Sequence, residues 1–288
     1  ENQPFQDFSA LWVSSDPYKW RAMRMHGIPE RLITGNSAGW EKFSAWAHTL
    51  PYLAGNPLYD WARLELERFF GIDEQLSPKN APHIWDQANE RLSQPGFLPQ
   101  SLLQSANVEC LVTSDAWLDT LDYHQQAKDD CLKPRLLPSL RADDAFAFES
   151  PAYLKWLNRL GQATGIGIHS LGTFLEALLK RLDVFDTSGC VLSDHGLDIP
   201  AYAACTEAEA ESIFKQILNS AACSASEYRQ ISTFLLLWLA GEYTRRGWTM
   251  QLHMGARRET SSSLAGKVGK QGGYAVMRAS IDDDAVVA

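Results

Sequence analysis

Two short polar segments, each joined to an apolar run, most constrain the fold of this chain. Residues 193–196 (Ser-Asp-His-Gly) follow the run at 189–192, and residues 251–255 (Gln-Leu-His-Met-Gly) overlap the end of the run at 248–252. We predict that each run is a buried strand with a carboxylate or imidazole at its end. Catalytic residues converge at the C-terminal ends of the strands of a parallel α/β barrel. The pattern therefore indicates an enzyme.

Strand and helix alternate over the second half of the chain. Strands are predicted at 107–113 and 133–138 in addition to the two runs, with helices at 117–128 and from Ser170 onward. Such alternation is typical of a parallel sheet. A nucleotide-binding doubly wound fold is disfavoured, since the sequence has no Gly-x-Gly-x-x-Gly turn or glycine-rich phosphate loop that follows a strand.

The sequence also marks the ends of the helices in this half. Two capping boxes, which pair Thr206 with Glu209 and Ser224 with Glu227, predict helix starts. Gly189 and Gly247 are predicted to end the two helices that precede the apolar runs.

Residues 1 to about 104 are predicted to form a helical subdomain. Within 37–53 the apolar residues Trp40, Phe43, Trp46 and Leu50 recur at spacings of three and four, which marks one face of a helix. Residues 105–288 are then the part that carries the strand-end residues. The chain begins at Glu1 and stops within a helix predicted after Ser280, so we expect both ends to be cut.

Composition limits the classes of partner. With 45% hydrophobic and 21% charged residues, the 288-residue chain can bury one large core or two modest ones. The net charge of −9 offers no broad basic surface, so nucleic acid is an unfavourable partner. The longest apolar run, residues 234–240, falls well below the roughly 20 residues of a membrane span, so we expect no membrane partner.

The cysteines indicate the compartment. They are odd in number, widely spaced and without a Cys-x-x-Cys pair, which predicts reduced, mostly buried thiols in a cytoplasmic protein. They are Cys110, Cys131, Cys190, Cys205 and Cys223.

A series of motifs runs in order along nearly the whole chain. It includes residues 16–24 (Asp-Pro-Tyr-Lys-Trp-Arg-Ala-Met-Arg), 55–59 (Gly-Asn-Pro-Leu-Tyr), 137–141 (Leu-Pro-Ser-Leu-Arg), 193–198 and 251–256. In these motifs the chain resembles the uronate isomerase (glucuronate isomerase) family of the amidohydrolase superfamily. The resemblance implies an α/β fold: a distorted (β/α)8 TIM-type barrel, here incomplete at both ends, with a helical insertion after its first strand.

The resemblance also implies the reaction. The expected activity is aldose–ketose interconversion of hexuronates, glucuronate to fructuronate or galacturonate to tagaturonate, by proton transfer through an enediol. That chemistry calls for an acid–base group, a Lewis acid and guanidinium groups for the carboxylate. By resemblance, Tyr18, Asp194 and His253 are the candidate catalytic residues. Lys19 and Arg21 are expected to supply a positive field beside the Tyr18 phenol.

Substrate and metal residues follow from the same motifs. Arg141 and Arg258 match arginines that hold the uronate carboxylate, with His195 as a further substrate-binding candidate or, alternatively, a packed core histidine. His253 is the expected metal ligand, for a divalent ion with zinc as the first candidate. The family's His-x-His pair and its Asp-Ser-Arg segment are not in this sequence, so further ligands must come from outside these residues and we expect little metal to stay bound.

Purely structural roles are alternatives to several of these functional assignments. Tyr18 could be a buried helix anchor, and the tryptophans of the first 104 residues are explained by helix packing rather than by sugar stacking. Two other functions also stay open: a metal-dependent hydrolase of the same superfamily, and a catalytically silent chain. A homo-oligomer is possible in either case.

Overall fold

The computed structural model describes residues 2–197, 202–220, 222–258, 260–269 and 272–277. The chain divides into two compact units, unit 1 (Glu1–Val108 and Arg257–Val276) and unit 2 (Glu109–Ala256 and Met277–Ala288). The predicted division after residue 104 differs mainly in Arg257–Val276, which joins the helical unit. The helix predicted after Ser280 lies outside the described residues.

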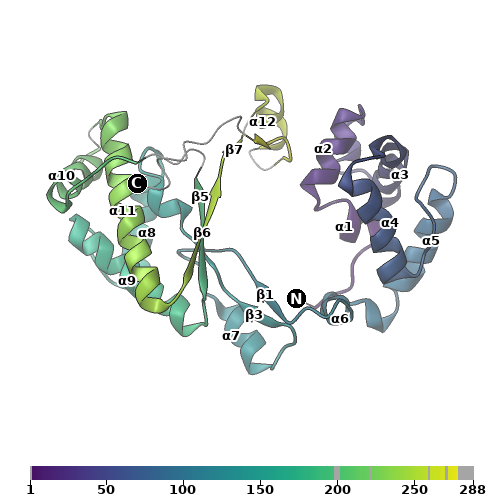
Figure 1. The fold of residues 1–288 in the computed structure, drawn as a ribbon, viewed down its shortest axis with the longest axis horizontal. Helices are drawn as coiled ribbons and strands as arrows, with labels where there is room; N and C mark the ends of the chain where they lie inside the picture. The colour runs from purple at the N-terminus through teal and green to yellow at the C-terminus, as the bar shows by residue number, and fades with distance from the viewer. Residues whose placement is uncertain (1, 198–201, 221, 259, 270–271, 278–288) are drawn as a thin grey trace. The chain divides into compact units, whose positions relative to one another are not determined.

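Unit 1 is helical, as the residue spacing predicted (Figure 1). The helix predicted at 37–53 forms α3 and its continuation η2, and its apolar face, with Phe43, Trp46 and Leu50, lies in the core of this unit. The elements are α1 (Phe8–Trp12), α2 (Pro17–Met25), η1 (Glu30–Leu32), α3 (Gly39–Thr49), η2 (Leu50–Leu53), α4 (Pro57–Phe70), α5 (Ala81–Leu92), η3 (Pro95–Phe97), α6 (Pro99–Ser105) and α12 (Ser262–Val268).

Unit 2 alternates strands and helices, and its strands pair in parallel. A four-stranded sheet has the order β2-β4-β5-β6, and β1 pairs with β3. The strands are β1 (Cys110–Val112), β2 (Asp115–Ala116), β3 (Arg135–Leu137), β4 (Leu140–Arg141), β5 (Leu192–Leu197) and β6 (Thr249–Met254). The helices are α7 (Asp122–Asp129), η4 (Asp143–Phe146), α8 (Tyr153–Thr164), α9 (Leu171–Thr187), α10 (Glu207–Leu218) and α11 (Ala225–Arg246). Two short strands, β7 (Ala256–Arg257) and β8 (Val276–Met277), pair with each other.

Helices α8 to α11 lie on one side of β5 and β6 (Figure 1). The alternation along β6 explains why: Met250, Leu252 and Met254 are half-buried, whereas the residues between them are exposed. A strand that is apolar on one face and polar on the other packs helices against the apolar face only. The polar face of these strands is left to carry the candidate site.

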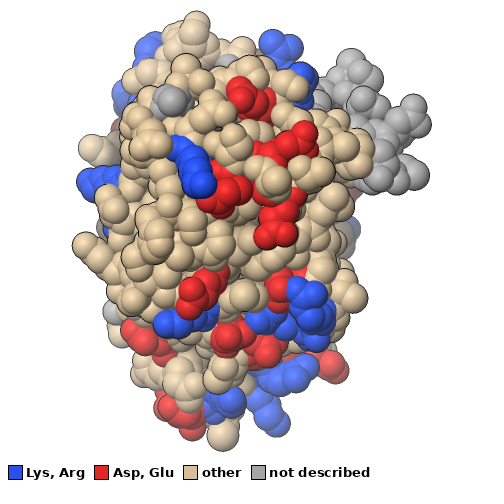
Figure 2. Space-filling model, turned by 90° about the vertical axis from the view of Figure 1, so that its left-hand side faces the viewer, with Lys and Arg blue, Asp and Glu red and all other residues tan. Residues whose placement is uncertain are grey.

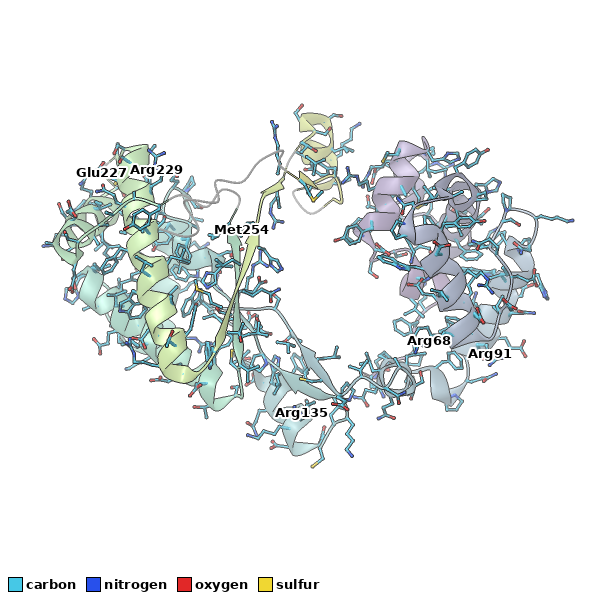
Figure 3. All side chains as sticks on the ribbon, in the orientation of Figure 1. Arg68, Arg91, Arg135, Glu227, Arg229 and Met254 are labelled. Atoms are coloured by element: carbon cyan, nitrogen blue, oxygen red, sulfur yellow. The ribbon has the colours of Figure 1, made fainter. Side chains whose placement is uncertain are left out.

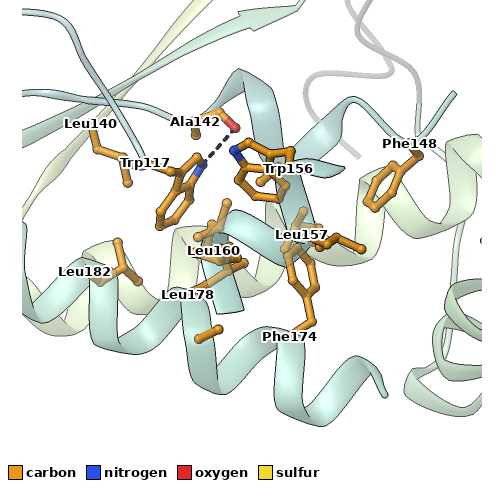
Figure 4. Packing of buried hydrophobic residues seen from close by; sticks show 14 of the residues in the cluster. Trp117, Leu140, Ala142, Phe148, Trp156, Leu157, Leu160, Phe174, Leu178 and Leu182 are labelled. Carbon is orange, nitrogen blue, oxygen red and sulfur yellow. Dashed lines mark hydrogen bonds between the residues drawn. The ribbon is translucent and has the colours of Figure 1, made fainter. Parts of the chain in front are cut away.

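The core of unit 2 differs from the sequence prediction at Trp117. The helix predicted to start there begins five residues later, at Asp122. Trp117 is instead buried, and its indole Nε1 donates to the carbonyl of Ala142 at 3.1 Å (Figure 4). The buried Arg181 of α9 donates to the carbonyls of Trp117 and Asp119 at 2.6 Å each. These bonds fix the segment after β2 against the start of η4.

The two strands that carry the site residues are displaced from the predicted runs. We predicted that residues 193–196 follow a strand at 189–192, but they lie inside β5, which begins at Leu192. The polar residues Ser193, Asp194 and His195 are all buried there, because β4 and β6 flank them on both sides. In the same way β6 continues past the predicted end at 252 and includes His253.

Helix boundaries follow their predicted caps. Both capping boxes are present, Thr206 with Glu209 before α10 and Ser224 with Glu227 before α11. Gly247 ends α11 with φ 68°, a left-handed conformation in which glycine has no steric cost. Gly189, with φ 90°, follows α9.

None of the five cysteines, all of which the structure describes, forms a disulfide, but the prediction that they are mostly buried is wrong. Cys190 is buried, Cys131 is exposed and the other three are half-buried. Desolvation raises the pKa of the Cys190 thiol to about 11, so this residue stays protonated and inert near neutral pH.

On the face shown in Figure 2, basic side chains are interspersed with acidic ones and form no continuous band. Of the helices in the described ranges, none combines the length and apolar character that a membrane crossing requires.

The capping box of α11 gives a stability prediction, because this helix leads directly into β6. Ser224→Ala removes the side chain that accepts from the Glu227 amide, at 3.2 Å. We expect the free energy of unfolding, measured with urea, to fall by about 1 kcal/mol. The exposed Ser212→Ala in α10 is the control and should leave stability unchanged or slightly raised. Equal losses in both variants would contradict the capping role.

Candidate active site

Three neighbouring strands of unit 2 carry the central candidate residues. Arg141 lies on β4, Asp194 on β5 and His253 on β6. Arg141 pairs in register with Asp194, and His253 pairs with Gly196, two residues beyond Asp194. Side chains in register, or two apart, point to the same face of a sheet. All three therefore project from one face.

Asp194 joins the other two side chains. Its Oδ2 accepts a short hydrogen bond from the Arg141 guanidinium, and its Oδ1 lies 2.5 Å from His253 Nδ1. Asp194 is only 6% exposed, whereas the His253 side chain is 52% exposed. His253 directly precedes Met254, the last residue of β6, which is labelled in Figure 3. Removing one partner of a buried ion pair costs about 3–5 kcal/mol, because the other charge is left unpaired. The stability of the buried, charged Asp194 side chain therefore depends on Arg141 and His253.

A second carboxylate, Asp143, completes the surroundings of Arg141. Asp143 Oδ2 accepts from Arg141 Nε at 2.8 Å, and its Oδ1 accepts from the amide of Gly196 at 2.8 Å. Burial lowers the pKa of Arg141, but the hydrogen bonds and charges of Asp143 and Asp194 raise this pKa by more. The guanidinium therefore stays charged.

His195 faces away from this cluster, as expected for the strand neighbour of Asp194. It is 1% exposed, and its ring lies near those of Phe146 and Tyr243, with centroids 5.8 and 5.6 Å away. Neither ring nitrogen has a hydrogen-bond partner among the described residues. Desolvation lowers the pKa of His195 to about 4. This position favours the packed-core alternative over direct contact with a substrate.

Tyr18 lies in unit 1, on α2. Its side chain is 73% exposed, so the buried-anchor alternative is wrong. It lines a mainly apolar groove of about 680 Å³ together with Trp12, Asp16 and Glu65, among others. The phenol is therefore accessible.

The two cations expected beside Tyr18 have other partners. The Lys19 ammonium is buried, donates to the Trp12 carbonyl at 2.8 Å, and lies 3.3 Å from Asp16 and 3.7 Å from Glu65. Arg21 donates to the carbonyl of Ala275 at 2.8 Å. Both side chains have structural roles within unit 1, and the expectation that they serve the phenol lacks support in these contacts.

Arg258, the second predicted carboxylate ligand, is exposed and belongs to unit 1. Tyr18 and Arg258 thus lie in one unit, and Arg141, Asp194 and His253 in the other. Whether all five line one pocket stays a prediction.

The described residues do not provide a complete metal site. Among them, no three His, Cys, Asp or Glu side chains gather closely enough to hold an ion. His253, the predicted ligand, has a single carboxylate beside it, whereas zinc sites typically use at least three protein ligands. The described side chains alone therefore do not fit a metal.

Comparison with known proteins supports the motif resemblance. A family model described as glucuronate isomerase matches residues 1–287. The chain belongs to the glucuronate isomerase family. Among curated relatives, the uronate isomerase of Bacillus licheniformis is 41% identical over 274 residues, and that of Shouchella clausii is 42% identical over 275. Each match covers 95% of this chain and 58% of the relative, so this member of the family spans less than two thirds of their length.

Solved structures of this family share the fold. The uronate isomerase of Thermotoga maritima superposes with a TM-score of 0.94 at 30% identity, over 99% of this chain and 63% of that one. The glucuronate isomerase of Caulobacter crescentus gives a TM-score of 0.92 at 23% identity, which supports the fold alone. The predicted fold class, a distorted α/β barrel that is incomplete in this chain and carries a helical insertion, agrees with this likeness.

Sequence reasoning missed Asp143 and Gly196. Both stand two residues after a predicted site residue: Gly196 follows Asp194 on the same strand and shares its face, and Asp143 follows Arg141 just beyond the end of β4. Gln251, whose Nε2 lies 3.3 Å from His253 Nε2, was read only as part of a strand end.

Burial of neutral His195 predicts a loss of stability in acid. The unfolded state binds a proton near pH 6.5, but the folded state does so only near pH 4, so the free energy of unfolding falls as pH drops through this window. The two pKa values correspond to a loss of about 3 kcal/mol. Urea titrations of His195→Phe should show a smaller loss than the native chain, while the exposed His83→Phe should not. A native-like acid loss in His195→Phe would refute this assignment.

Proposed function

We propose that this protein is a uronate isomerase that interconverts an aldohexuronate, such as glucuronate, with the corresponding ketohexuronate. Galacturonate is a second expected substrate. Family membership combined with one observation carries the proposal: a carboxylate, a guanidinium and an exposed imidazole meet on one face of the parallel sheet, as Asp194, Arg141 and His253. Because the chain spans 58% of the length of these relatives, its activity and substrates are proposals.

The cluster suits proton transfer between adjacent carbons. In an aldose–ketose conversion a base removes the C2 proton, and the resulting enediol is protonated at C1. Asp194 is the candidate base, and His253, whose Nδ1 lies 2.5 Å from Asp194 Oδ1, is the neighbouring acid–base group. Tyr18 is the candidate donor to the substrate oxygens. Arg258 is the candidate anchor for the substrate carboxylate, assisted by the N–H groups that Arg141 has free.

A divalent metal, with zinc first, belongs to the proposal. Its ligand set would include His253 and residues other than those described. No role is assigned to the metal in the proton transfer, because the described side chains do not make a complete site.

The catalytically silent alternative draws on a specific observation, the lack of three clustered metal-binding side chains among the described residues. The hydrolase alternative would use Asp194 to activate water. Family membership supports isomerisation over hydrolysis.

The three functions are distinguished by one experiment. The chain is incubated with glucuronate or galacturonate in D2O, with and without added Zn²⁺, and ¹H NMR follows the substrate. Isomerisation predicts the ketose and exchange of the C2 proton with solvent. Hydrolysis of an added amide or ester without C2 exchange would support the hydrolase, and no reaction under any condition would support the silent chain.

Asp194→Asn is the decisive variant for the proposed base. The amide cannot accept the C2 proton, so we expect isomerisation to fall at least about 100-fold. The exposed Asp129→Asn, on α7, is the matched control and should keep native activity. Circular dichroism should show that both variants are folded. An Asp194→Asn variant with native activity would exclude this carboxylate as the base.

Location and partners are further parts of the proposal. The five free thiols support a cytoplasmic location. The acidic net charge supports a small-molecule substrate rather than nucleic acid, and neither a membrane partner nor a particular oligomer is required by the proposal. A homo-oligomer remains compatible with it.

A further inference from the structure

We propose that Asp143 and Gly196 form a seat for the Arg141 guanidinium that holds it against Asp194, which makes Asp143 a positioning residue. The geometric part of this proposal concerns unit 2 alone. Its catalytic consequence rests on the proposed isomerase function.

Asp143 connects two strands through its two oxygens. Oδ2 accepts from Arg141 Nε at 2.8 Å, so it holds a side chain of β4. Oδ1 accepts from the Gly196 amide at 2.8 Å, so it holds the backbone of β5. A charge-assisted hydrogen bond is about twice as strong as a neutral one. Loss of this one carboxylate would therefore release the guanidinium and the strand together.

Gly196 supplies the space for the seat. A Cβ at this position would lie 2.6 Å from the second terminal nitrogen of Arg141 and 2.9 Å from Asp143 Oδ2, closer than real Cβ atoms approach. The backbone of Gly196 is not left-handed, so the requirement is for room and not for conformation. Both atoms that a methyl group would meet are ends of flexible side chains. Gly196→Ala should therefore displace the guanidinium without unfolding the sheet.

Two of the three nitrogens of Arg141 donate hydrogen bonds, and the third lies close to Gly196. Nε donates to Asp143, one terminal nitrogen donates to Asp194, and the other lies over Gly196. Since the guanidinium is planar, these neighbours fix its orientation. It can offer a substrate only the N–H bonds that remain on its terminal nitrogens. Its main role is then to orient the Asp194 carboxylate.

The backbone beneath Asp143 is itself fixed. The amide of Ala142 donates to the Asp194 carbonyl at 3.1 Å, and the Ala142 carbonyl accepts from the buried Trp117 indole (Figure 4). Asp143 then begins η4. The carboxylate therefore projects from a rigid point directly beside β5, as a positioning residue requires.

The test measures the Arg141 Nε–H group directly. In ¹⁵N-labelled full chain, its NMR signal is assigned by its disappearance in Arg141→Lys, and its hydrogen exchange with water is measured. Asp143→Asn should speed this exchange at least about tenfold, because a charge-assisted hydrogen bond is lost. Gly196→Ala should shift the signal and also speed exchange. The control Asp144→Asn, an exposed neighbour in η4, and Gly167→Ala, with open space around its Cβ, should leave it within about twofold.

A second measurement compares the isomerisation kinetics of the variants with those of the native chain. If the seat serves catalysis, Asp143→Asn lowers kcat at least about tenfold while KM stays within about threefold, since orientation of Asp194 and not substrate binding is impaired. The two controls should keep both constants.

The exchange measurement tests the seat, and the kinetic measurement tests its role in catalysis, so each can be contradicted without the other. Rapid exchange of Arg141 Nε–H in the native chain, or exchange unaffected by both Asp143→Asn and Gly196→Ala, would overturn the seat. Should Asp143→Asn not fold, Gly196→Ala decides the question alone. A protected Nε–H in a chain that isomerises no uronate would refute the proposed function and leave the seat standing. A native kcat in Asp143→Asn, with accelerated exchange, would refute the positioning role.

Discussion

The contact between Arg141 and Asp194 is the interaction on which the rest of the candidate site depends. Asp194 is almost fully buried in the middle of a parallel sheet, where an unpaired carboxylate would be strongly destabilising. The guanidinium of the neighbouring strand compensates that charge, and the imidazole of His253 takes the other oxygen. A carboxylate is therefore held at a buried strand position, where an aliphatic side chain would otherwise be expected.

The rigidity of this contact comes from the layer beneath it. Helices α8 to α11 cover the apolar face of the strands, and the Trp117 indole and Arg181 guanidinium satisfy carbonyls in the turns after β2 and β4. Buried hydrogen bonds of this kind are costly to break because the carbonyls have no access to water. The polar face can then hold side chains in one arrangement while its exposed edge, at His253, stays open to a ligand.

Several elements were predictable because their signals are local. Capping boxes at Thr206 and Ser224, the glycine after α11 and the helical spacing at 37–53 depend on residues a few positions apart, and each produced the expected helix. The strand ends were displaced because apolar runs mark burial by hydrophobicity, whereas β5 continues through buried polar residues. Asp143 and Gly196 were missed because the hydrogen bond that joins them spans 53 positions of the chain.

The sequence by itself determined the family, the alternation of strand and helix in the second half, and the identity of Arg141, Asp194 and His253 as site candidates. Motif order and local periodicity carry that information without reference to distance. Only the tertiary structure decided that Asp194 pairs with both Arg141 and His253, that His195 turns into the core, and that the Lys19 ammonium is buried against the Trp12 carbonyl. The physical reason is that register between parallel strands, separated by long helical connections, sets which side chains meet, and register is a property of the packed sheet.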